Sequence, residues 1–214
     1  MKRTATLILL CAMMCTVYAH AQDNTGTTAG NSISLKYKMV DNDDVNRLMD
    51  FLKTYRLDVS VRGKGLKGRE FKVVTVTCRN GVFSESGGEE NSMAFRAYSN
   101  TLDFVFFAQQ TSPDTVRISW DGGGAVSTKD FPVPESTHPI LMETYSSVKY
   151  TDKDSIPIMA YSTGQLLEFD LGDGNKGTTI YYCGLRDAKV HPREWPAKYG
   201  IKDFVYFYII FPEE

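Results

Sequence analysis

Phe-Val-Tyr-Phe-Tyr-Ile-Ile-Phe, at residues 204–211, is the stretch that decides the fold. All eight residues are aromatic or β-branched, none is charged, and Pro212 ends the run. Eight residues is the length of a strand and is short for an apolar helix. Because polar and apolar residues do not alternate, both faces of this strand should be covered. The sequence therefore predicts a strand inside a sheet or sandwich and not at its rim.

The rest of the chain has the pattern of a mainly β protein. Apolar and polar residues alternate over short runs bounded by Gly, Pro, Asn or Asp, which is typical of half-buried strands. Residues 81–91 are predicted as a loop, and 131–139 as a loop or edge because they include three prolines. Strands are expected at residues 33–37, 57–63, 71–78, 93–98, 102–108, 116–120, 140–148, 156–161, 166–171 and 178–185.

One helix is expected near the N-terminus. The acidic run at 41–44 precedes Val45, Leu48, Met49 and Leu52, which are spaced i, i+3, i+4 and i+7. Carboxylates suit a helix N-terminus, both as caps and as partners of the helix dipole. The same run does not continue the spacing of an EF-hand calcium loop, so we predict a helix cap and no metal site.

The N-terminus has the pattern of a signal peptide. Lys2 and Arg3 precede a mostly apolar run at 7–17, and Ala19-His20-Ala21 forms an A-x-A cleavage site. The apolar run is too short to span a bilayer. We therefore expect cleavage after Ala21, a disordered leader over 22–31, and export to the periplasm, cell surface or medium without membrane insertion.

Cleavage changes the charge and the cysteine count. Removing 21 of the 214 residues leaves 193, enough for one large β domain or two small ones. Removing two of 24 basic residues, against 26 acidic ones, leaves a net charge of −4, which argues against a nucleic-acid partner. Cys11 and Cys15 leave with the signal, so Cys78 and Cys183 remain. They form either one disulfide or two separate buried thiols, since spacing does not fix geometry.

Two segments share an order of landmarks. Residues 63–68 and 172–177 both read G-x-G-x-K-G, and each precedes a cysteine-bearing strand and then a strand that begins Asp-Phe-Val. The shared order favours an internal duplication over convergence, with two similar halves at 32–112 and 113–214. Because Gly follows the Lys and a strand comes next, the motif predicts a flexible turn and not a phosphate loop.

The second half resembles a known family. Thr115–Trp120 is similar to the tryptophan-bearing second strand of fibronectin type III domains, and residues 166–171 and 180–183 are similar to their E strand and tyrosine-bearing F strand. Residues 204–211 would be the G strand. The resemblance covers about residues 115–212 and implies an immunoglobulin/fibronectin-like β-sandwich that binds or spaces and does not catalyse. The first half departs from it. The signal peptide also resembles those of secreted Bacteroidetes proteins of unknown function.

The sequence has no established motif for catalysis, metal binding or a cofactor. His138 and His191 are the mature histidines, and each precedes a proline instead of lying in an H-E-x-x-H pattern. Cys183 and His191 would make a nucleophile pair, but they lack a local signature. Paired carboxylates of a glycan hydrolase are defined by their separation in space, so a glycan hydrolase stays an alternative.

The connection at 192–200 is the best binding candidate. It places Trp195 and Tyr199 in a polar, proline-containing loop, with Arg193 adjacent. Exposed aromatic side chains on a loop held by a sandwich suit sugar stacking or protein anchoring. The alternative is that Trp195 folds back as a lid over the sandwich end.

We therefore expect an exported, non-catalytic binding module whose ligand is a glycan or a protein. The alternatives are a secreted glycan hydrolase and a structural subunit that adds an edge strand to a surface assembly. An exposed aromatic loop would favour the binder, and a cleft with two close carboxylates, one with a raised pKa, would favour the enzyme. An unpaired apolar edge would favour the subunit.

Overall fold

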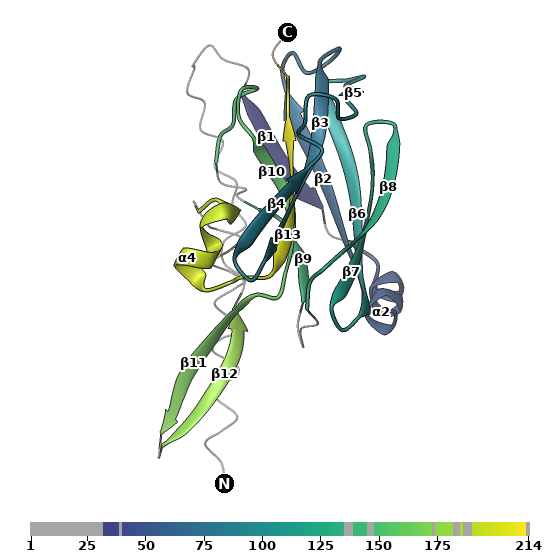
Figure 1. The fold of residues 1–214 in the computed structure, drawn as a ribbon. Coiled ribbons are helices and arrows are strands. Elements are labelled where there is room, and N and C mark those ends of the chain that lie inside the picture. The colour runs from purple at the N-terminus through teal and green to yellow at the C-terminus, as the bar shows by residue number, and fades with distance from the viewer. Residues whose placement is uncertain are drawn as a thin grey trace. The chain divides into compact units, whose positions relative to one another are not determined.

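The computed structural model describes residues 32–38, 40–134, 139–144, 148–172, 174–181, 185 and 190–212. The expected signal peptide and leader, His138 and Cys183 lie outside these residues. Within them the chain is mainly β, built from two large antiparallel sheets and a separate two-stranded sheet (Figure 1). The prediction of a mainly β protein with a helix near the N-terminus is confirmed.

The first large sheet follows the alternating pattern of its sequence. Side chains at every second position point into the molecule, and polar ones such as Arg117 and Asp130, whose Nε and Oδ1 lie 2.8 Å apart, point outward. Its strand order is β1-β2-β6-β7-β8. The strands are β1 (Ile33–Lys38), β2 (Thr54–Gly63), β6 (Thr101–Ser112), β7 (Thr115–Gly122) and β8 (Ala125–Phe131).

The second large sheet has the decisive stretch near its centre. β13 pairs β3 on one side and β10 on the other, so the prediction of an interior strand is confirmed. The strand order is β4-β3-β13-β10-β9, and the short β5 also pairs β3. The strands are β3 (Glu70–Arg79), β4 (Val82–Ser86), β5 (Phe95–Arg96), β9 (Ile140–Met142), β10 (Ile156–Ser162) and β13 (Phe204–Ile210).

The main core lies between the two sheets, in a sandwich-like arrangement. Phe207 of β13 is buried there, with its ring centroid 5.5 Å from that of Phe106 in β6 and 5.9 Å from that of Phe131 in β8. Such edge-to-face contacts suit the quadrupoles of aromatic rings. One strand of the second sheet thus contacts two strands of the first.

A second apolar layer covers the outer face of the second sheet. Phe204, Tyr206 and Tyr208 alternate with the core-facing residues of β13 and lie on this face. Leu185 and Trp195 are buried against them. The connection expected at 191–200 contains a 3-10 helix, η1 (Pro192–Glu194), and a short helix, α4 (Trp195–Tyr199).

Two similar halves are not confirmed. Strands β3 and β4 share a sheet with β9, β10 and β13, while β1, β2 and β6 share the other with β7 and β8. The two G-x-G-x-K-G segments also differ, since 63–68 links strands of different sheets and 172–177 spans the turn of one hairpin. The fibronectin type III topology is not confirmed either. The expected E and F strands pair only with each other within the described residues, and β13 pairs neither of them.

Two strands lie where the sequence analysis did not place them. β4 falls in the predicted loop 81–91, and β8 follows the glycine turn at 123–124. Both are edge strands with mostly exposed side chains, so their composition resembles that of a loop. The predicted helix is α2 (Asp43–Phe51), and its cap is Asn42, whose side chain accepts hydrogen bonds from the backbone N–H groups of Asp44 and Val45.

Candidate functional site

The predicted binding residue Trp195 is fully buried. Its ring centroid lies 5.1 Å from that of Phe204, and its Nε1–H donates to the Val190 carbonyl over 3.4 Å. The ring is therefore not free to stack on a sugar. Trp195 therefore folds back onto the protein, as the second alternative expected. Its ring covers the outer face of the second sheet and not the end of the sandwich.

Arg193 and Tyr199 lie close to Trp195 but do not form an open binding face with it. The Arg193 guanidinium is ion-paired with Glu85 of β4, and its central carbon lies 5.5 Å from the centre of the Phe83 ring. Tyr199 packs partly buried against the outer apolar layer. Through these two contacts Arg193 attaches the connection to β4.

Polar groups beneath this connection form a small network. Glu85 also accepts a hydrogen bond from the Tyr208 hydroxyl. Burial, together with this bond, raises the pKa of Tyr208 well above its usual value. Burial raises the pKa of Tyr206 to about 12, against the opposing effect of the Arg193 guanidinium near its hydroxyl. Burial, with the charge of Arg193, lowers the pKa of His191.

Cys78 lies at the edge of the same layer. Among the described residues its sulfur has no disulfide partner, and it is buried 3.3 Å from the Lys202 carbonyl oxygen. Burial raises the pKa of this thiol to about 11, so little reactive thiolate forms at neutral pH. The other predicted partner, Cys183, lies outside the described residues, so the choice between a disulfide and separate thiols stays a prediction.

The separate two-stranded sheet is a hairpin of β11 (Gln165–Gly172) and β12 (Asn175–Tyr181). Its register runs from the pair Gln165–Tyr181 to the pair Gly172–Asn175. In the described part of the chain no other strand pairs with it, so each strand has one unpaired edge. Unpaired backbone N–H and C=O groups along an edge are a template for another strand.

Apolar side chains of the hairpin are open to solvent. Phe169 and Tyr181 lie on one face by their register, and Leu171 lies at a bulge beside the turn. Between 40% and 61% of each of these side chains is exposed. Phe169 lies across Gly177, where an added Cβ would be 2.6 Å from the ring, so glycine permits this close approach.

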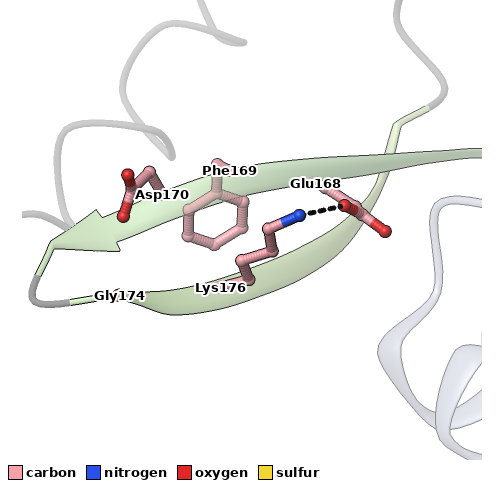
Figure 2. A pocket seen from close by; sticks show the side chains of 5 residues that line it. All are labelled: Glu168, Phe169, Asp170, Gly174 and Lys176. Atoms are coloured by element: carbon pink, nitrogen blue, oxygen red, sulfur yellow. Dashed lines mark hydrogen bonds and ion pairs between the residues drawn. The ribbon is translucent and has the colours of Figure 1, made fainter.

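A hollow of about 300 Å³ lies on the hairpin near its turn (Figure 2). Its lining residues come from both strands and the turn, and Lys176 Nζ is ion-paired with Glu168 over 3.4 Å. The strand at 166–171 was expected from the sequence, but the exposure of its side chains was not. The lining residues are Glu168, Phe169, Asp170, Gly174 and Lys176.

Other kinds of site find no support in the described residues. These residues contain no cluster of three or more His, Cys, Asp or Glu side chains that suits a metal ion. They also contain no helix that is long and apolar enough to cross a membrane. Comparisons of the chain with protein-family models, curated proteins and solved structures gave no match.

Proposed function

We propose that the chain is an exported, non-catalytic interaction module and that the β11–β12 hairpin contacts a protein partner. The observation that carries this proposal is the combination of two strand edges that no other described strand pairs with and the exposed side chains of Phe169, Leu171 and Tyr181. An extended partner segment adds a strand to such an edge, where backbone hydrogen bonds supply affinity and side chains supply specificity.

A protein fits this surface better than a glycan does. Trp195, the side chain best suited to sugar stacking, is buried, and Arg193 is engaged with Glu85. The hairpin offers backbone groups in strand geometry, which peptides match and sugars do not. Phe169 and Tyr181 keep enough exposed ring surface that sugar binding is a useful outcome to test.

A structural subunit of a surface assembly is the second candidate, and the same hairpin favours it. If the added strand comes from a neighbouring copy and the contact is repeated head to tail, the result is a ring or, where the rotation does not close, a filament. A hetero-partner would instead give a closed complex. The enzyme alternative has less support. A general acid needs a raised pKa, whereas the pKa is lowered in four carboxyl groups of the described residues. These are Glu89, Asp114, Asp130 and Glu194.

The test is a binding screen of the chain from residue 22 onward. A library of phage-displayed linear peptides and a glycan array are the probes. We expect apolar, strand-forming peptides to be selected, and we expect Phe169→Ser and Leu171→Ser to abolish their binding. Val126→Ser is the matched control, because Val126 is also exposed but lies on β8.

Two results would count against the proposal. The first is glycan binding with no peptide binding. The second is peptide binding that survives both hairpin substitutions. Ordered filaments in electron micrographs that disappear with Phe169→Ser would favour the structural subunit.

A further inference from the structure

The two faces of the β11–β12 hairpin differ in chemistry. Phe169 and Tyr181 lie on one face by their register, whereas Glu168, Asp170 and Lys176 lie on the other. These three charged residues also line the hollow near the turn (Figure 2). Because the side chains of a strand alternate between faces, a strand added at an edge would place every second residue on the charged face. The charges of that face therefore decide which residues suit the partner at those positions.

The charged face carries an excess of negative charge. Lys176 Nζ is ion-paired with Glu168 over 3.4 Å, and both side chains are largely exposed. Asp170 accepts a hydrogen bond from the Gly172 N–H over 2.8 Å, and in the described part of the chain it has no ion-pair partner. The rest of the hairpin sequence adds one acid, Asp173, which lies outside the described residues, and no base. A basic group that reaches this face therefore meets a carboxylate whose charge is not compensated.

The charges distinguish the two edges of the hairpin. Glu168 and Asp170 belong to β11, so a strand that pairs with the edge of β11 lies directly beside both carboxylates, with side chains about 5 Å apart. At the edge of β12 the same strand would lie beside Lys176, and like charges directly opposite each other destabilise a sheet. β11 also carries Phe169 and Leu171, two of the exposed apolar side chains. A strand with basic and apolar residues thus fits the edge of β11 better than the edge of β12.

We propose that the partner segment adds to the edge of β11 and carries arginine at the alternate positions that face Glu168 and Asp170. This inference rests on the proposed function of the hairpin and specifies the chemistry of its partner. The residues between the arginines are apolar and lie on the face of Phe169. Arginine suits a carboxylate better than lysine does, because its planar guanidinium donates two parallel hydrogen bonds. The hollow, about 300 Å³ in volume, gives a long side chain room beside these carboxylates.

The phage-displayed peptide library tests this pattern directly. Among peptides selected on the chain from residue 22 onward, we expect arginine to be enriched at alternate positions relative to the unselected library. A selected peptide is then synthesised once with arginine and once with citrulline, which has nearly the same shape and no charge. Fluorescence anisotropy of the labelled peptides should show the arginine peptide binding about two- to fivefold more tightly, the effect of one solvent-exposed ion pair. Added salt should reduce this preference.

Single-charge substitutions separate an effect of charge from a structural one. Asp170→Asn keeps an acceptor for the Gly172 N–H and should bring the two peptides to nearly equal affinity. Lys176→Gln should instead increase the preference for arginine, because Glu168 loses its ion-pair partner. A merely structural disturbance of the hairpin would weaken the binding of both peptides in both variants. Glu90→Gln is the matched control, since Glu90 is exposed outside the hairpin and its substitution changes the net charge by the same amount as Asp170→Asn.

The outcomes distinguish this inference from the proposed function. Peptides that bind through the hairpin with no preference for arginine over citrulline overturn the inference and leave the proposed function standing. Enrichment of acidic residues among the selected peptides overturns it in the same way. A preference for arginine that survives Glu168→Gln and Asp170→Asn together also overturns it, because the carboxylates would not be its cause. If no peptide binds at all, the proposed function fails and this inference fails with it.

Discussion

Replacing Phe207 by alanine tests whether β13 holds the two sheets together. Only 2% of Phe207 is exposed, and its ring contacts Phe106 and Phe131 of the first sheet. Phe→Ala at a buried site costs about 3–5 kcal/mol, from the lost transfer energy and the cavity that remains. That is a large share of the roughly 5–15 kcal/mol by which a domain is stable. In a chain of this size it corresponds to a fall in Tm of roughly 6–20 °C.

Thermal and urea unfolding followed by circular dichroism measure this effect. We expect one cooperative transition with a lower midpoint and an unchanged urea m-value, because the surface exposed on unfolding is nearly the same. Phe169→Ala is the matched control, since the same atoms are removed from a side chain that is 45% exposed. Its effect should stay within about 0.5 kcal/mol. A Phe207→Ala protein with the wild-type Tm would refute the central role of β13.

Three other predictions concern groups outside this core. Mass spectrometry of exported protein should show a chain that begins at Gln22, and a chain that begins at Met1 would contradict the predicted signal peptide. Cys78 should resist Ellman's reagent in the native state because its pKa is raised to about 11, and denatured, unreduced protein should show two free thiols, whereas a count of none would establish a disulfide. His191 accepts a hydrogen bond at Nδ1 from the Arg193 N–H, and its folded pKa lies below the ordinary 6.5. The unfolded chain therefore binds this proton more readily, so Tm should fall as the pH drops below about 6.5, and His191→Gln should flatten that fall.

The sequence predicted the interior of the fold better than its edges. β13 has no polar face, so both of its faces had to be covered, and the sequence therefore predicted a strand in the interior of a sheet. β8, with Ser127, Lys129 and Asp130, has few apolar residues to produce an alternating signal. The pairing of the strands could not be predicted either, because the composition of a strand does not determine which sheet it joins. The shared landmarks of the two halves therefore suggested an equivalence that the strand pairing does not confirm.

The burial of Trp195 shows why its exposure was hard to predict from the neighbouring residues. Its neighbours Arg193 and Glu194 are polar, and this local composition indicated an exposed loop. The outer face of β13 also carries aromatic rings, Phe204 and Tyr206, and these needed a cover. Both facts were present in the sequence. They lie about ten residues apart, and only the three-dimensional structure brings the indole onto that face.

An apolar stripe in a sequence specifies which side of an element avoids water, but not what covers it. The opposing sheet covers the apolar faces of β6 and β7. In α2 and the β11–β12 hairpin, by contrast, several apolar side chains remain exposed to solvent. Holding Phe51 or Phe169 in water forgoes the favourable free energy of burying it. A partner that covers either side chain recovers that free energy without any change in the core. At both elements association would therefore gain free energy, and the peptide screen tests this for the hairpin.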